Sequence, residues 1–333
     1  MSCIRFFKGA VLATAIAGFS APAMSATTWD LPLAWPDGNF HVENAKRFAA
    51  EVGKATDGEV VINIHPGGSL GFKGPEMLRS VRDGLIPIGD VLLNQQVGEA
   101  PLLGLEATPY LANGHADLQT FHRYWRPEVE ALVGSRFNQK VLYMVPWPRQ
   151  YVYTKVEIKR IEDLGGIKIR TYNKTTTGMF NRVGMTAVQL PWGEVVPSLA
   201  AGTIDAVTTS ASSGVDGKFW EFLSYMYPTN HVWSSNAVTV NLDSWNALSA
   251  GQRQTIEALA QRLEADFWEV SKQEDTKKVE ILNSRGVKTG TVTPDMMAAM
   301  QQQTAPMLDE LLASIGDPAP RIINDYKKAL GRN

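Results

Sequence analysis

Residues 167–210 decide the fold: IKIRTYNKTTTGMFNRVGMTAVQLPWGEVVPSLAAGTIDAVTTS. The stretch opens with a short strand that ends at Arg170. A helical segment, a second short strand, a turn carrying Trp192, another helix and a strand ending in hydroxyl side chains follow. This alternation predicts a mostly parallel sheet covered by helices. Ligands of such sheets bind at the carboxyl ends of the strands, so an arginine placed there indicates a site for a small anion.

The flanking sequence predicts a second unit of the same kind and a helix that connects the two. Strands and helices alternate over residues 28–93, and a strand at 237–241 is expected to return to this first unit. Ser249 is placed to cap a helix running to about Arg285, which at 1.5 Å per residue would be about 50 Å long and could brace both units. We therefore predict an α/β protein of two lobes. Lobe I would comprise residues 27–150 and 236–275, and lobe II residues 151–235 and 276–333.

The first 26 residues have the pattern of an export signal. Arg5 and Lys8 precede an apolar run at 10–19, and small residues follow up to Ala26, after which we expect cleavage. The alternative, an uncleaved anchor, would need a longer apolar run than this one. We therefore expect a periplasmic product. Cys3, the single cysteine of the chain, belongs to the signal, so no disulfide is expected in the mature protein.

Charge and motif content narrow the function. The chain has 32 basic and 34 acidic residues, and the predicted signal would remove two basic residues and no acidic one. That balance argues against nucleic acid or an anionic membrane as partner. The five histidines show no metal-ligand spacing, and there is no phosphate-binding loop or Gly-x-Ser-x-Gly nucleophile motif. We expect no metal and no cofactor.

Two arginines are candidate anion ligands. Arg170 offers a planar guanidinium that matches a carboxylate with two parallel hydrogen bonds. The spacing is equally compatible with a surface arginine or a salt bridge between lobes. Arg149 follows Trp147 and Pro148 after another predicted strand, beside the expected hinge. It is either a second cation for the same anion or a solvated turn residue.

Aromatic and polar side chains near strand ends complete the candidate set. Trp192 and Trp35 stand in turns, where an indole could pack on a ligand or belong to the core. The hydroxyl run after the last strand could donate to a carboxylate or be ordinary loop composition; we take from it Thr208, Thr209 and Ser210. Asn94 ends a predicted strand beside Asp90, and loop polarity is the alternative account of both.

Three segments in order resemble one known family. Residues 162–170, EDLGGIKIR, residues 190–195, LPWGEV, and residues 199–206, LAAGTIDA, are similar to segments of the substrate-binding proteins of tripartite ATP-independent periplasmic (TRAP) transporters. The resemblance extends over the whole predicted mature chain. It implies a two-lobed periplasmic binding protein fold with a long bracing helix, a cleft that closes on an organic acid, and docking of the closed form on a membrane permease. We expect a monomer.

The resemblance also implies roles for single residues. Arg170 matches the family arginine that pairs with the ligand carboxylate, Arg149 resembles a second basic pocket position, and Trp192 matches the aromatic position that packs on the ligand. The family's usual DGxEN segment is replaced here by residues 205–210, DAVTTS, with Thr209 at the asparagine position. That departure removes the usual amide contact.

The ligand and the class of function remain open at this stage. The tryptophan content and the missing asparagine favour an apolar or aromatic monocarboxylate, or a 2-oxo acid. An exported enzyme acting on a small organic acid is the alternative, although we find no recognisable nucleophile or acid–base pair. A ligand-sensing partner of a membrane receptor is a third possibility.

Overall fold

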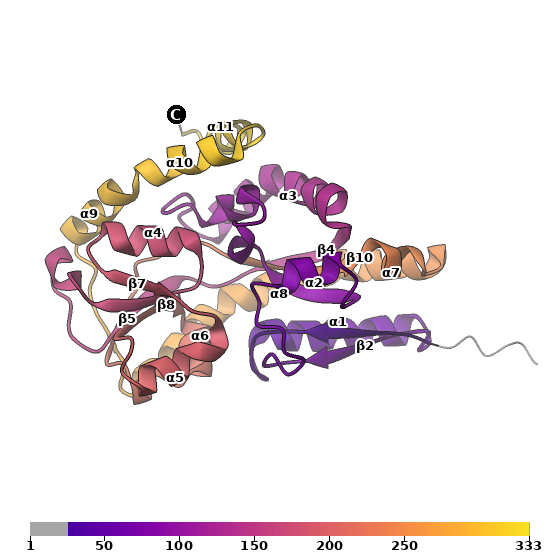
Figure 1. Cartoon of the computed structure of the whole chain (residues 1–333), viewed down its shortest axis with the longest axis horizontal. Coiled ribbons are helices and arrows are strands. Elements are labelled where there is room, and N and C mark those ends of the chain that lie inside the picture. The colour runs from indigo at the N-terminus through magenta and orange to yellow at the C-terminus, as the bar shows by residue number, and fades with distance from the viewer. Residues whose placement is uncertain (1–25, 333) are drawn as a thin grey trace, which may run out of the picture.

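The computed structural model describes residues 26–332, and Figure 1 shows two groups of strands and helices side by side. Residues 1–25 of the predicted export signal, with Cys3, lie outside the described residues. Within residues 26–332, no helix is both long and apolar enough to cross a membrane.

The first lobe starts with a parallel β-α-β unit. Strands β1 (Thr27–Pro32) and β2 (Val60–His65) pair in parallel, and helix α1 (Phe40–Ala55) connects them. The side chain of Asn39 begins α1 by accepting a hydrogen bond from the backbone N–H of His41 at 2.9 Å. Apolar residues then recur at helical spacing and bury one face of α1 in the core.

A three-stranded sheet lies beside this unit. Its central strand β10 (Ser235–Asn241) runs antiparallel to β3 (Ile88–Leu92) on one side and to β4 (Gln139–Pro146) on the other. The return of residues 237–241 to the first lobe is therefore confirmed. The helices around this sheet are α2 (Met77–Arg82), α3 (His115–Phe137) and α7 (Leu242–Asn246).

The second lobe is built on a six-stranded sheet. Its strands lie in the order β11 (Lys288–Thr289), β9 (Tyr225–Tyr227), β5 (Gln150–Thr154), β8 (Ala206–Ser210), β6 (Lys168–Thr171) and β7 (Thr186–Gln189). The accompanying helices are α4 (Lys174–Arg182), α5 (Val195–Ala200) and α6 (Ala211–Asp216). Strands β8, β6 and β7 are mutually parallel, as the alternating pattern of residues 167–210 predicts.

The expectation of mostly parallel sheets needs a correction at the strands that carry the chain between lobes. β10 is antiparallel to both of its neighbours, and β5 is antiparallel to β8 and β9. The physical reason is the direction in which the chain enters the second sheet. β4 leaves the first lobe and β5 begins only four residues later, so β5 starts at the edge of the second sheet where β6 and β8 end.

Helix α8 (Ala250–Ser284) spans both lobes, as expected. Ser249 caps it: its side chain accepts from the backbone N–H of Gln252 at 3.2 Å, and the Gln252 side chain accepts from the backbone N–H of Ser249 at 2.8 Å. The helix packs on α1 and β4 in the first lobe and on α6 in the second. It ends before Gly286, whose φ of +99° suits glycine.

The C-terminal helices cross from one lobe to the other. Figure 1 shows α9 (Pro294–Thr304), α10 (Pro306–Ile315) and α11 (Ala319–Ala329) running in sequence over the second lobe toward α3. α11 packs on α3, and Ile322, Ile323 and Tyr326 share a buried cluster with Phe121 and Trp125. This packing differs from the prediction that residues 276–333 belong wholly to lobe II.

Candidate functional site

A cavity lies where the two lobes meet. Its lining comes from strand ends and the residues beside them in both lobes: Trp35, Leu92, Gln95, Trp147, Gln150, Arg170, Tyr172, Trp192, Thr209, Ser213 and Ser234. Parallel strands such as β6 and β8 end at the cavity, whereas the crossing strands β5 and β10 begin there. Both arrangements bring side chains to the edge at which sheet ligands bind.

Arg170 is the central feature of the cavity. The side chain leaves β6 near its carboxyl end, and the residue is only 3% exposed. Its Nε donates to the carbonyl oxygen of Leu190 at 3.0 Å, and its guanidinium carbon lies 5.7 Å from the ring centre of Tyr172. Among residues 26–332 no carboxylate comes within 4.0 Å of it, and neither Nη atom has a hydrogen-bond partner there. Burial lowers the pKa of Arg170 to about 10, so it remains a cation at neutral pH.

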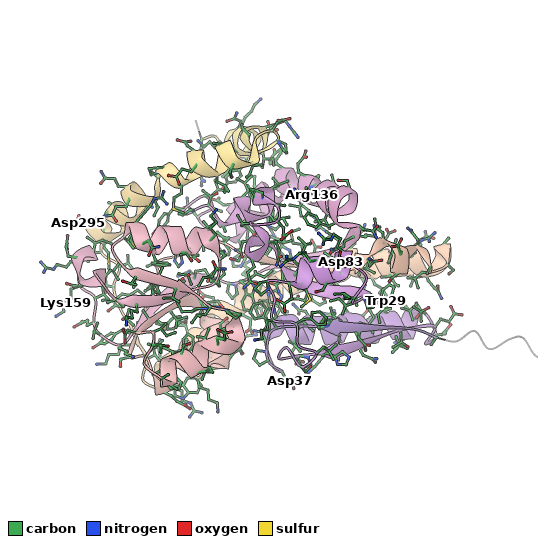
Figure 2. The ribbon with its side chains drawn as sticks, in the orientation of Figure 1. Trp29, Asp37, Asp83, Arg136, Lys159 and Asp295 are labelled. Atoms are coloured by element: carbon green, nitrogen blue, oxygen red, sulfur yellow. The ribbon has the colours of Figure 1, made fainter. Side chains whose placement is uncertain are left out.

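This environment contrasts with that of charged side chains on the surface. Asp37, Lys159 and Asp295, labelled in Figure 2, are exposed on the outside of the molecule. A buried charge normally has an opposite charge beside it, because taking an ion out of water is costly. The free face of the Arg170 guanidinium is therefore suited to an anion that the protein itself does not supply.

Indole rings form the apolar part of the wall. Trp35 and Trp147 meet edge to face, with ring centres 4.7 Å apart and planes at 74°. Trp192 begins the short helical turn Trp192–Glu194 and packs against apolar clusters on both sides of the cavity. The cavity can thus hold a ligand that is anionic at one end and apolar or flat elsewhere.

Hydroxyl and amide groups supply the polar part. The hydroxyls of Tyr172 and Ser234 lie 3.0 Å apart, and the Asn94 side chain donates to the Ser234 hydroxyl at 2.5 Å. Gln95 donates to the backbone carbonyl of Tyr172 at 3.4 Å. These bonds connect strand ends of both lobes. They also hold the polar side chains in fixed positions at the cavity wall.

Four predicted site residues line the cavity and four do not. Arg170, Trp192, Thr209 and Trp35 are brought together there. Arg149 lies outside the lining, is about half exposed, and has its Nε 3.5 Å from a carboxylate oxygen of Asp275. The solvated-turn interpretation describes it better than that of a second pocket cation.

The other three have structural partners. Thr208 hydrogen-bonds to the buried imidazole of His231 at 2.8 Å, on the face of β8 opposite to Thr209, because successive strand residues point to opposite faces. Ser210 caps α6 by accepting from the backbone N–H of Ser213 at 3.3 Å. Asn94 does not line the cavity and donates to the Ser234 hydroxyl behind the wall.

Several lining residues are absent from the predicted set. Tyr172 stands two positions after Arg170, so strand alternation could have found it. Gln150 and Ser234 stand at the beginnings of crossing strands, and only the antiparallel direction of β5 and β10 reveals that these beginnings face the cavity. Trp147 and Gln95 gave no signal beyond lying near strand ends.

Comparison with known proteins identifies the class. Residues 33–314 match the family described as bacterial extracellular solute-binding protein, family 7, and the chain belongs to it. It is a TRAP-type solute-binding protein with the two-lobed α/β fold, which confirms the resemblance in residues 162–206 and the predicted fold class.

Individual relatives cover nearly the whole chain. A TRAP solute-binding protein from a marine metagenome, described as specific for pyroglutamate, is 34% identical with a TM-score of 0.87, over 91% of this chain and 99% of that one. DctP6 of Bordetella pertussis, described as binding pyroglutamic acid, is 30% identical with a TM-score of 0.87, over 91% and 100%. The ectoine/5-hydroxyectoine-binding periplasmic protein UehA of Ruegeria pomeroyi is 24% identical, over 98% and 97%. These relatives are solute-binding proteins.

Proposed function

We propose that this protein captures a small cyclic monocarboxylate, pyroglutamate, in the cavity between its lobes. The observation that carries the proposal is Arg170, a buried guanidinium whose outward-facing donors have no protein acceptor among the described residues. The ligand carboxylate would accept two parallel hydrogen bonds from it.

The charge of the cavity supports one carboxylate and not two. Arg170 is the charged side chain among the lining residues at neutral pH, since burial raises the pKa of Tyr172 to about 12. Arg149, which would have offered a second cation, is paired with Asp275 outside the lining. A second ligand carboxylate would therefore be buried without a partner, at a cost of about several kcal/mol.

The remaining wall suits a compact ring with polar edges. The cavity is narrow and leaves little free space between its walls, which favours a compact ligand. Trp35, Trp147 and Trp192 offer flat apolar surfaces, and the Tyr172 and Ser234 hydroxyls offer hydrogen bonds. Pyroglutamate combines one carboxylate with a ring amide that can donate and accept. Three solved relatives at 27–34% identity are described as binding or specific for it, which supports the same choice here.

We further propose that the protein is exported to the periplasm, acts as a monomer and delivers its ligand to a membrane permease. The family is described as extracellular, and residues 1–26 have the pattern expected of an export signal. The lobes would move about the two crossings near residues 150 and 235 and about α8. In that case the lobes would close on the ligand and present a closed form to the permease.

A ligand panel tests the substrate. Mature protein, refolded to remove carried-over ligand, is titrated by calorimetry with pyroglutamate, an aromatic acid, a 2-oxo acid, a C4-dicarboxylate and galactonate. We expect pyroglutamate to bind most tightly and the dicarboxylate at least about a hundredfold more weakly. Tighter binding of any other acid in the panel would overturn the substrate assignment.

The enzyme alternative is tested on the same samples. Bound pyroglutamate is released after prolonged incubation with the protein and its NMR spectrum is recorded. We expect the ligand to be recovered unchanged. Conversion that depends on Arg170 would favour the exported enzyme.

A further inference from the structure

We propose that Asp90 is a positioning residue that fixes the two indole rings of the cavity wall, Trp35 and Trp147. Asp90 lies on β3, is 4% exposed and does not line the cavity. It would therefore act on the ligand only through other side chains.

The first connection is direct. The indole N–H of Trp35 donates to Oδ1 of Asp90 at 3.0 Å. Trp35 follows β1 in an irregular segment, where the backbone alone does not fix the ring. The hydrogen bond ties the ring to the central sheet of the first lobe.

The second connection passes through Asn236 at the start of β10. The indole N–H of Trp147 donates to Oδ1 of Asn236 at 2.7 Å, and the amide nitrogen of Asn236 donates to the same Oδ1 of Asp90. The carboxylate accepts from this amide, so it dictates which end of the Asn236 side chain faces Trp147. One oxygen atom of Asp90 thus orients both rings, which meet edge to face 4.7 Å apart.

These bonds need an acceptor and not a charge. Burial raises the pKa of Asp90 to about 7, so near neutral pH part of the population is protonated. A carboxyl group with its proton on Oδ2 still offers Oδ1 to both donors. An asparagine at position 90 could do the same with its amide oxygen.

The orientation of the two rings sets the shape of the apolar wall, so Asp90 should affect which ring-shaped ligand fits. This effect on affinity rests on the proposed function. The orientation of the rings does not, and it can be measured without ligand.

Hydrogen exchange of the indole N–H groups tests the positioning directly. The nine tryptophans are labelled with ¹⁵N, and the signals of Trp35 and Trp147 are assigned with W35F and W147F. Trp125, whose buried indole donates to the carbonyl oxygen of Leu102 at 2.9 Å, reports global opening in the same sample. T239V is the matched control. Thr239 lies on β10, like Asn236, and the substitution removes the buried hydrogen bond that its hydroxyl donates to the Gln139 side chain on β4.

In D90L we expect the Trp35 and Trp147 indoles to exchange at least about tenfold faster relative to Trp125. D90N should stay within about threefold of the parent, and T239V should leave both ratios unchanged. N236A, a second route if D90L does not fold, should release Trp147 and leave Trp35 protected. The proposal is overturned if Trp147 keeps its relative protection in D90L or N236A, or if all three indoles accelerate together.

The dissociation constant for pyroglutamate then links ring position to binding. We expect it to rise about tenfold in D90L and to change less than about threefold in D90N and T239V. An unchanged value in D90L, with both rings released, would overturn the link to the ligand. If the parent protein does not bind pyroglutamate, only the proposed substrate is refuted, because the exchange experiment still decides the role of Asp90.

Discussion

Arg170 gives the sharpest prediction at the scale of single residues. Truncating one partner of a buried charge pair costs about 2–5 kcal/mol. We therefore expect Arg170→Ala to raise the dissociation constant for pyroglutamate by a factor between about thirty and a few thousand. Isothermal titration calorimetry measures it. Arg149→Ala is the matched control, since that side chain is half exposed and outside the cavity lining, and it should change affinity less than about threefold. Equal affinities of the parent and Arg170→Ala would contradict the assignment of Arg170.

Side-chain direction decides which site residues could be predicted. Arg170 and Thr209 lie on strands, where alternation and the carboxyl-end rule fix both place and direction. Thr208 was predicted beside Thr209, but the same alternation turns it to the opposite face, onto His231. Arg149 follows a strand in a short connection, where no periodicity fixes the direction of the side chain. Its partner Asp275 is 126 positions away in sequence, and only the folded chain brings them together.

At the scale of elements, α8 can be tested apart from the binding site. Replacing the cap Ser249 with alanine removes one half of a reciprocal pair with Gln252, and we expect a loss of about 1 kcal/mol of unfolding free energy. Urea denaturation followed by circular dichroism measures it. Ser284→Ala, the same change at the other end of the helix, should cost less than about 0.5 kcal/mol because that side chain is exposed. Ligand affinity should be unchanged in both, and a weaker effect at Ser249 than at Ser284 would argue against the cap.

The elements that could be predicted are those with a local signal. Helix α8 is the clearest case, because the cap Ser249 and the apolar period predict a helix to about Arg285 and the structure has it from Ala250 to Ser284. Strands β9 and β11 were missed because they contain only three and two residues, too few to show a period. The direction of β5 and β10 was also not predictable locally, since it depends on how the chain crosses between the lobes.

At the scale of the whole molecule, a hydrogen bond joins the two lobes. The amide of Asn39, which caps α1, donates to the carboxylate of Asp216 at the end of α6 at 2.7 Å. Burial raises the pKa of Asp216 from 3.8 to about 6, and the bond from Asn39 offsets part of that rise. On α8, Lys278 lowers the pKa further and Glu274 raises it. If the lobes part, Asn39 leaves and water returns, so the pKa of Asp216 should fall toward 3.8.

This difference predicts that closure is coupled to proton uptake. The Asp216 carboxyl is protonated below a pH of about 6 in the closed form but only below about 4 in the open form. Closure between these pH values therefore takes up a proton. Because the pKa of Asp216 is higher in the closed form than in the open form, closure is favoured at low pH and weakens as the pH rises through 6. A ligand carboxylate with a pKa of roughly 3.5 stays ionised over this range. Asp90 should not contribute, because its partners Trp35 and Asn236 belong to its own proposed lobe.

We therefore expect the dissociation constant for pyroglutamate to be about tenfold lower at pH 5 than at pH 7.5. Asp216→Asn keeps an acceptor for Asn39 and removes the titration, so its dissociation constant should vary less than about threefold over the same range. Asp266→Asn, at an acid that pairs with Arg47 within the first lobe, should retain the slope of the parent. Calorimetry at the two pH values in buffers of different ionisation enthalpy also counts the protons taken up on binding. A flat profile in the parent, or the parent's slope persisting in Asp216→Asn, would show that this contact between the lobes does not govern closure.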